Sequence, residues 1–223
     1  MATVAILAKF FGLAFSALLP LINPFGSALI FLGLVGDQPI SVYRDLARRI
    51  AFNTVTFLLV VELVGTALLA FFGISLPVVQ VSGGLVLASM GWSLLNKPDS
   101  RDESKTEAAE ASTGTLDQKI FYPLTFPVTA GPGCIVVMLT LTAHASTKGL
   151  FSNALAHLGI FLAVVVLSVT VFVCYAYAPK ISQRVSPQTA HGVLRVIAFV
   201  LLSIGVQITW NGVETLMKSV MKS

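Results

Sequence analysis

Two short segments place proline, glycine and small polar residues inside otherwise apolar sequence. The first comprises Asn23, Pro24, Phe25, Gly26 and Ser27, and the second comprises Thr129, Ala130, Gly131, Pro132, Gly133 and Cys134. Because proline has no amide proton and its ring clashes with the preceding turn, each segment predicts a break in a helix followed by a new helix start. Asn23 is a favoured N-cap residue for such a start, and Gly131 can take the same position in the second segment.

A helix that starts inside a membrane leaves backbone amides without an intrahelical acceptor. We expect such free N–H groups at the three residues that follow Pro24 and at the three that follow Pro132. Together with the positive ends of the helix dipoles, they would suit a small anion such as the carboxylate of an amino acid. Asn23–Ser27 and Thr129–Cys134 are therefore our candidate substrate-binding residues. The alternative is that both breaks serve helix packing alone.

Long apolar stretches carry these two segments. The chain has 223 residues, of which 56% are hydrophobic and 11% charged, whereas soluble domains have about 25% charged residues. A membrane span needs about 20 mostly apolar residues, and six stretches qualify: 9–35, 50–72, 76–95, 119–143, 154–178 and 192–217. The sequence predicts an all-α membrane protein of six transmembrane helices, with the first and the fourth broken at mid-membrane.

The predicted spans form two sets of three, joined by a polar linker. Because three is an odd number, a repeat of three spans must be inverted in its second copy, as in many secondary transporters. Aligning Pro24 with Pro132 superimposes the two breaks, and Ala88–Gly91 aligns more weakly with Leu202–Gly205. The predicted parts are a first three-helix repeat at 1–96, the linker at 97–118 and a second, inverted repeat at 119–223.

The distribution of basic residues predicts the orientation, since Lys and Arg in short loops stay in the cytoplasm. Most of the 14 fall on one side of the predicted spans: Arg44, Arg48, Arg49, Lys97, Arg101, Lys105, Lys119, Lys180, Arg184 and Arg195. The other side holds Lys9, Lys148, Lys218 and Lys222. We therefore expect a cytoplasmic linker and both termini outside the cytoplasm.

Four more polar residues within the predicted spans are candidates for lining a cavity or for coupling: Glu62, Gln80, Gln207 and Asn211. An ionised carboxylate such as that of Glu62 costs roughly 2.5 to 3.5 kcal/mol at the membrane centre. Glu62 could carry a coupled proton, meet a substrate ammonium group, or stay protonated and bond to a neighbouring helix. The three amides equally suit hydrogen bonds between helices.

Several chemistries have no support in the sequence. His144, His157 and His191 occur singly near span ends, where a solvated or capping histidine is expected, so we predict no metal site. No hydrolase or nucleotide-binding motif is present, so we expect neither an enzyme nor a bound cofactor. The basic residues are scattered and form no patch for nucleic acid.

A wider likeness rests on four groups of residues: Pro20–Gly26 with the apolar run to Gly33, Gly73–Gly84, Thr129–Gly133, and Gly205, Gln207, Asn211 and Gly212. Together they resemble the MarC family of bacterial inner-membrane proteins over nearly the whole chain, and Thr129–Gly133 is the most specific of them. The resemblance implies six helices with both termini periplasmic, in agreement with the basic residues. It also implies transport of small neutral amino acids such as glycine and alanine.

The leading hypothesis is a secondary transporter of the inner membrane that holds the carboxylate of a neutral amino acid between the two helix starts. Its expected partners are the substrate, the lipid bilayer and a coupling ion, either a proton or sodium. An exporter of another small solute is one alternative, and a membrane component without transport activity is another. The sequence leaves the oligomeric state open.

Overall fold

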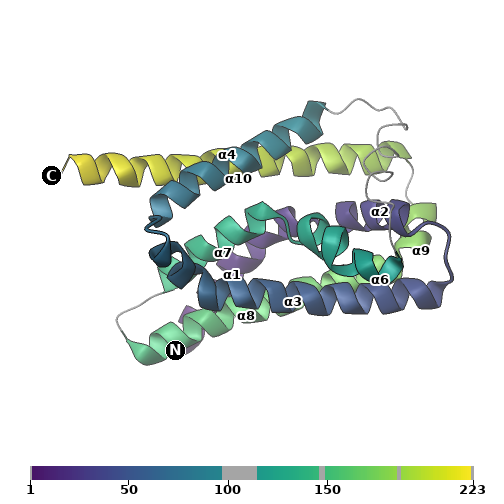
Figure 1. The fold of residues 1–223 in the computed structure, drawn as a ribbon, viewed down its shortest axis with the longest axis horizontal. Helices are drawn as coiled ribbons and strands as arrows, with labels where there is room; N and C mark the ends of the chain where they lie inside the picture. The colour runs from purple at the N-terminus through teal and green to yellow at the C-terminus, as the bar shows by residue number, and fades with distance from the viewer. Residues whose placement is uncertain (1, 97–114, 146–148, 185–186, 222–223) are drawn as a thin grey trace.

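The structure is a computed structural model that describes residues 2–96, 115–145, 149–184 and 187–221. Within these ranges the regular structure is entirely helical (Figure 1). The elements are α1 (Ala2–Ile22), α2 (Pro24–Val35), α3 (Ile40–Phe71), α4 (Leu76–Asn96), α6 (Leu116–Lys119), η1 (Ile120–Thr129), α7 (Pro132–Ala145), α8 (Leu150–Ala176), α9 (Ala178–Arg184) and α10 (Pro187–Val220). An all-α fold was predicted and is confirmed.

Five helical stretches among the described residues are long and apolar enough to cross a membrane, and α1 with α2 counts as one of them. Each overlaps a predicted span, and the largest difference is at the second, which begins at Ile40 rather than at residue 50. The fourth predicted span is instead a pair of segments, Leu116–Thr129 and Pro132–Ala145, bent by 65° at the break between them. The protein therefore has five or six candidate spans, depending on whether this bent pair crosses the membrane.

Helix α8 packs one face against α1, α2 and α3. Its opposite face carries exposed apolar side chains such as Leu158 and Val169, as expected of a helix that meets lipid at the edge of a bundle. Near its end the ring of Tyr175 is fully buried and stacks on Phe31 of α2, with ring centroids 4.5 Å apart. The edge of Tyr43, from the first turn of α3, meets the same phenylalanine. These aromatic contacts fix α2 against α8 and α3.

Helices α4 and α10 form a close pair along one side of the bundle (Figure 1). Glycines allow their backbones to touch, because a Cβ added at Gly91 would lie 2.5 Å from the backbone nitrogen of Leu202. A Cβ at Gly205 would likewise lie 2.4 Å from the backbone nitrogen of Ala88. Small residues at a helix interface are the usual means of close packing in membranes, where hydrophobic burial drives association only weakly.

The predicted polar linker, 97–118, falls outside the described residues except for its end. There Thr115 begins the short helix α6, and its N–H donates to Gln118 Oε1 over 3.1 Å. Asp117 in α6 forms an ion pair with Arg49 of α3, which also lies 3.6 Å from Asp45. The last residues of the segment therefore form a short helix, which an exposed ion pair links to α3.

Candidate functional site

The first break lies between α1 and α2, where the sequence predicted it. Asn23 adopts a left-handed conformation (φ 43°, ψ 65°), which is uncommon for a residue other than glycine. Its side-chain Oδ1 accepts a hydrogen bond of 3.0 Å from the N–H of Gly26. Asn23 is thus the N-cap of α2, with Pro24 in the first helical position, as expected.

The second break follows an irregular segment, η1. Tyr122 and Phe126 each precede a proline and are extended rather than helical, because the proline ring disfavours the helical conformation of the residue before it. Two threonine side chains of η1 donate hydrogen bonds to backbone carbonyl oxygens of the same segment. Thr125 Oγ1 donates to the carbonyl oxygen of Ile120 at 2.7 Å, and Thr129 Oγ1 donates to that of Leu124 at 2.6 Å.

The structure brings the two breaks together in the core. The buried hydroxyl of Ser27 donates to the carbonyl oxygen of Ile22 at 2.7 Å and lies 3.2 Å from that of Val128, just before the second break. Thr129 Oγ1 lies 2.8 Å from the hydroxyl of Tyr175, and the latter also faces Ser27. Three buried hydroxyls, on α2, η1 and α8, therefore meet where the two breaks adjoin.

The expectation of free amides at both helix starts was wrong for Gly26, Ser27 and Cys134. The Gly26 amide is capped by Asn23 Oδ1, and the Ser27 amide donates to the Asn23 carbonyl over 2.9 Å. The Cys134 amide donates to the carbonyl of Gly131, also over 2.9 Å. Phe25 and Gly133 hold the second position of their helices, where an amide has no intrahelical acceptor. Capping by Asn23 and tightening of the first turn of α7 account for the difference.

The break region is close-packed in this conformation. Ala130 and Thr129 are fully buried and Cys134 is almost so. A Cβ added at Gly133 would lie 2.1 Å from Leu87 Cδ2 and 3.3 Å from Leu21 Cδ2, so helices α4 and α1 both press on this position. A ligand could enter between the breaks only if these helices separate.

An open cavity of about 530 Å³ lies instead between α3, α6 and η1. Charged and amide side chains line much of it, and its wall continues to the start of η1; the lining residues are Asp45, Arg48, Arg49, Phe52, Asn53, Asp117, Gln118, Ile120 and Phe121. The basic residues that predict the cytoplasmic face, Arg48 and Arg49, are among them. The cavity is thus a hollow at the end of the bundle rather than a site between the breaks.

Glu62 is buried, with 3% of its side chain exposed, and pairs with His157 of α8. The distance between Glu62 Oε1 and His157 Nδ1 is 3.0 Å. The Glu62 carboxyl group thus bonds to a neighbouring helix, which was one of the alternatives predicted for it. The expectation that His157 is merely solvated or capping was wrong, because pairing across helices cannot be deduced from a histidine's distance to a span end.

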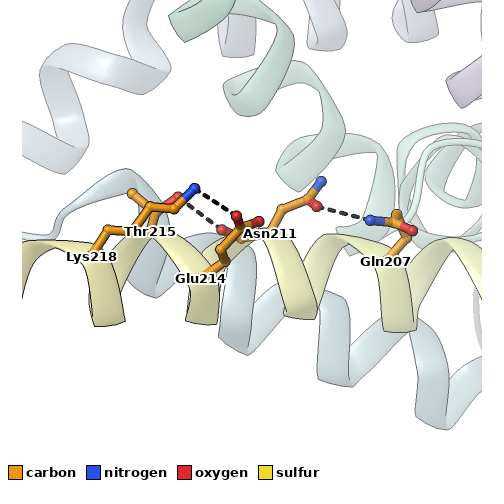
Figure 2. A network of polar contacts seen from close by, with 5 residues as sticks. All are labelled: Gln207, Asn211, Glu214, Thr215 and Lys218. Atoms are coloured by element: carbon orange, nitrogen blue, oxygen red, sulfur yellow. Dashed lines mark hydrogen bonds and ion pairs between the residues drawn. The ribbon is translucent and has the colours of Figure 1, made fainter.

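The three predicted amides lie away from the breaks. Gln80 of α4 is buried and donates to Thr140 Oγ1 of α7 at 3.4 Å, a bond between helices. Gln207 and Asn211 are exposed on α10 and bond to each other at 2.8 Å (Figure 2). In that view they continue into a row with Glu214, Thr215 and Lys218 along the same helix.

Sequence reasoning missed Tyr175 and the two threonine bonds within η1. Two aromatic-proline pairs, Tyr122–Pro123 and Phe126–Pro127, each followed by a threonine two positions later, were the available signal for the irregular segment. Nothing in the sequence singles out Tyr175, because its role depends on where α8 packs. The described residues contain no group of side chains arranged to hold a metal ion.

Comparison with known proteins identifies the relatives of this fold. The model of the MarC family of integral membrane proteins matches residues 8–217. Inner membrane proteins named MarC from Salmonella paratyphi B and Salmonella typhimurium are each 29% identical over 95% of this chain and 97% of their own length. The one from Escherichia coli O1:K1 / APEC is 26% identical with the same coverage. No solved structure matches the chain. The chain belongs to the MarC family and is an integral inner-membrane protein.

Proposed function

We propose that this protein is a secondary transporter of small neutral amino acids, which binds the substrate between the two helix breaks. The observation that carries the proposal is the contact between Ser27, Thr129 and Tyr175 at the point where the breaks adjoin. Irregular backbone within a membrane is tolerated where protein or a water-filled cavity satisfies it, and broken helices of this kind form the central sites of many transporters.

The chemistry of the site suits an amino acid. When the helices separate, the Ser27 and Thr129 hydroxyls and the Phe25 and Gly133 amides become donors for a carboxylate. Carbonyl oxygens such as that of Val128, which now faces Ser27, become acceptors for the ammonium group. The Ser27 and Thr129 hydroxyls bond to protein oxygens in the conformation described here, which corresponds to a closed arrangement in such a cycle.

Two inverted repeats, 1–96 and 119–223, would supply the moving halves. In the alignment of Ala88–Gly91 with Leu202–Gly205, Gly91 corresponds to Gly205 and Ala88 corresponds to Leu202. A twofold axis that relates the two segments would therefore require two equivalent contacts, one between Gly91 and Leu202 and one between Gly205 and Ala88. Both contacts are present. Reciprocal contacts of this kind are expected at a pseudo-twofold axis between α4 and α10. They support the inverted repeat that the aligned prolines predict.

The proposal includes six spans with both termini in the periplasm. The labelled termini lie at one end of the bundle in Figure 1, whereas α6 and α9 lie at the other. Arg44 and Lys180 lie over the ring of Tyr177, beside α9 at that second end, and this concentration of basic residues supports a cytoplasmic location for it. The bent pair then crosses the membrane once, and the chain has an even number of spans.

Ligand-dependent stabilisation of the detergent-purified protein tests the proposal. Glycine and alanine should raise the melting temperature, whereas glycinamide and alaninamide, which lack the carboxylate, should not. Ser27→Ala and Tyr175→Phe should weaken the shift, since each removes a hydroxyl from the site without adding atoms. Ser203→Ala is the matched control, because this exposed serine donates its hydrogen bond to the carbonyl oxygen of Phe199 in its own helix.

Uptake in proteoliposomes then separates the proposal from its alternatives. Counterflow of radiolabelled glycine identifies a transporter of neutral amino acids. Counterflow of a different solute would favour an exporter of that solute. If no amino acid stabilises the protein and none is exchanged, the proposal is wrong and a membrane component without transport activity is the better interpretation.

A further inference from the structure

The pair formed by Glu62 and His157 lies inside the membrane-spanning part of the bundle and joins α3 to α8. Glu62 precedes the end of α3 at Phe71 by about 14 Å along the helix, and His157 follows the start of α8 at Leu150 by about 10 Å. Those helix ends lie at the same end of the bundle (Figure 1). The pair therefore lies within the membrane-spanning part of the bundle, and His157 is the member nearer to the end of the bundle that is proposed to be periplasmic.

The two side chains differ in their access to the surroundings. The Glu62 side chain is 3% exposed, whereas that of His157 is 29% exposed. The imidazole ring is therefore more accessible from outside the helix bundle than the carboxyl group is. One turn earlier on the same face of α8, the amide oxygen of Asn153 is buried without a hydrogen-bond partner among the described residues. This unsatisfied acceptor is a polar group between the start of α8 at Leu150 and the imidazole ring.

Other ionisable groups on the surrounding helices do not neutralise this pair. Lys9 of α1 is exposed and lies over the ring of its neighbour Phe10. His144 of α7 is exposed and bonds to the carbonyl of Thr140 in its own helix. Asp117 and Lys119 of α6, and Lys180 and Arg184 of α9, lie at the opposite end of the bundle, and α2 carries no ionisable side chain.

We propose that Glu62 and His157 form a proton-binding site in the membrane, which exchanges its proton with water at the end of the bundle where α8 begins. With one proton the pair has no net charge, either as imidazolium and carboxylate or as imidazole and carboxylic acid. Loss of that proton to water leaves a carboxylate beside a neutral imidazole, which is a net negative charge in a low-dielectric region. Proton binding therefore favours the closed packing of α3 on α8, and proton loss favours an arrangement that hydrates the pair.

Histidine is suited to this exchange because its charge changes between about pH 5 and 8. The proton site itself does not depend on the proposed transport. Its use as the coupling site for amino acid transport does rest on that proposal, and would assign the proton, rather than sodium, as the coupling ion.

Infrared difference spectroscopy of the reconstituted protein between about pH 5.5 and 9 tests the site directly. The wild-type protein should give a signal from a carboxylic acid carbonyl or from the imidazole ring, and both Glu62→Gln and His157→Gln should abolish it. His144→Gln is the matched control and should retain it. A signal that persists unchanged in either Glu62→Gln or His157→Gln would overturn the proposal.

Folding of the variants needs its own check, because Glu62 is buried. Glutamine preserves the size and hydrogen-bonding capacity of Glu62, so gel filtration should show a monodisperse protein. If Glu62→Gln does not fold, Glu62→Asp replaces it, since the carboxyl group is then retained in an altered environment. The pH-dependent signal should shift in Glu62→Asp, and an unshifted signal would assign the proton to another group.

The coupling role has a separate readout. Glycine counterflow requires no net proton movement, whereas accumulation driven by an imposed pH gradient does. Glu62→Gln should keep counterflow and lose at least ten-fold of the gradient-driven accumulation. Equal accumulation by Glu62→Gln and the wild type would overturn the coupling role, while failure of counterflow in the wild type would overturn the transport proposal and leave the infrared result unaffected.

Discussion

The hydroxyl oxygen of Ser27 lies 3.2 Å from the carbonyl oxygen of Val128, so a side chain in the first turn of α2 contacts the backbone just before the second break. The two residues are 101 positions apart in the chain. The Ser27 hydroxyl has a single proton, and it also donates to the carbonyl oxygen of Ile22, at the end of α1, over 2.7 Å. The contact with Val128 is therefore the weaker one and the first that opening of the breaks would lose.

Ser27→Ala should destabilise the protein by about 1 kcal/mol, because a hydrogen bond contributes about 0.5 to 1.5 kcal/mol net. Unfolding in mixed micelles with increasing denaturing detergent measures the change. The exposed Ser203, replaced by alanine, should give a loss near zero, since the carbonyl it contacts is already part of a helix. Equal losses for Ser27→Ala and Ser203→Ala would show that the contact between the breaks contributes nothing.

Replacement of Asn23 separates its two roles. Asn23→Ala loses the cap on Gly26, which is worth about 1 kcal/mol, and places an alanine at φ 43°, which costs roughly 1 to 2 kcal/mol. Asn23→Gly adopts that conformation easily and loses only a few tenths as a cap. The order of stability should be wild type, then Asn23→Gly, then Asn23→Ala. If alanine were as stable as glycine, the left-handed conformation of Asn23 would not hold in solution.

The positions of the helices could be predicted from the lengths of the apolar stretches, and the positions of the breaks from the prolines. Both features depend on residues that are close together in the sequence. Leu76–Asn96 was predicted to within one residue, and the α1–α2 break was placed at Asn23. The irregular backbone of η1 was not predicted. Its signal lies in the residues that precede Pro123 and Pro127, rather than in the Thr129–Gly133 segment that predicted the break.

Contacts between distant residues were not predictable in the same way. The pairing of Glu62 with His157 depends on which face of α3 packs against α8. The sequences of the two spans do not determine that face. Gln207 and Asn211 could have faced inward on the basis of sequence, yet α10 turns its glycine face to α4 and leaves these amides exposed. Hydrophobic length determines where a membrane helix lies in the chain, but packing of small residues determines which face is buried.

Gly205 should tolerate no side chain. In Gly205→Ala the new Cβ would lie 2.4 Å from the backbone nitrogen of Ala88, and backbone cannot rotate away as a side chain can. We expect a loss of about 1 to 3 kcal/mol, the usual cost of overpacking, or more. Gly12→Ala is the matched control, because nothing lies within 4 Å of its Cβ position, and alanine there should stabilise α1 by roughly 0.5 to 1 kcal/mol. Detergent unfolding of both variants gives the comparison, and similar effects at the two glycines would contradict the close α4–α10 pairing.

Tyr175 and Thr129 should be energetically coupled. Tyr175→Phe removes the hydroxyl that lies 2.8 Å from Thr129 Oγ1 but keeps the ring stacked on Phe31. Each of Tyr175→Phe and Thr129→Val should destabilise the protein by about 1 kcal/mol, and the double variant should lose less than the sum because the shared bond is lost once. Additive losses in this cycle would mean that the two hydroxyls act independently.

The bent pair gives the last prediction, because its two ends lie on opposite membrane faces only if it crosses the bilayer. In a background without Cys134 and Cys174, single cysteines at Gln118 and Leu150 mark those ends, and both positions are exposed. A membrane-impermeant thiol reagent added to intact cells should label Leu150→Cys, and should label Gln118→Cys only after the membrane is permeabilised. Labelling of both positions from the same face would make the bent pair a re-entrant loop. Such a loop would leave five spans, place the two termini on opposite sides and remove the inverted repeat on which the proposed alternating access depends.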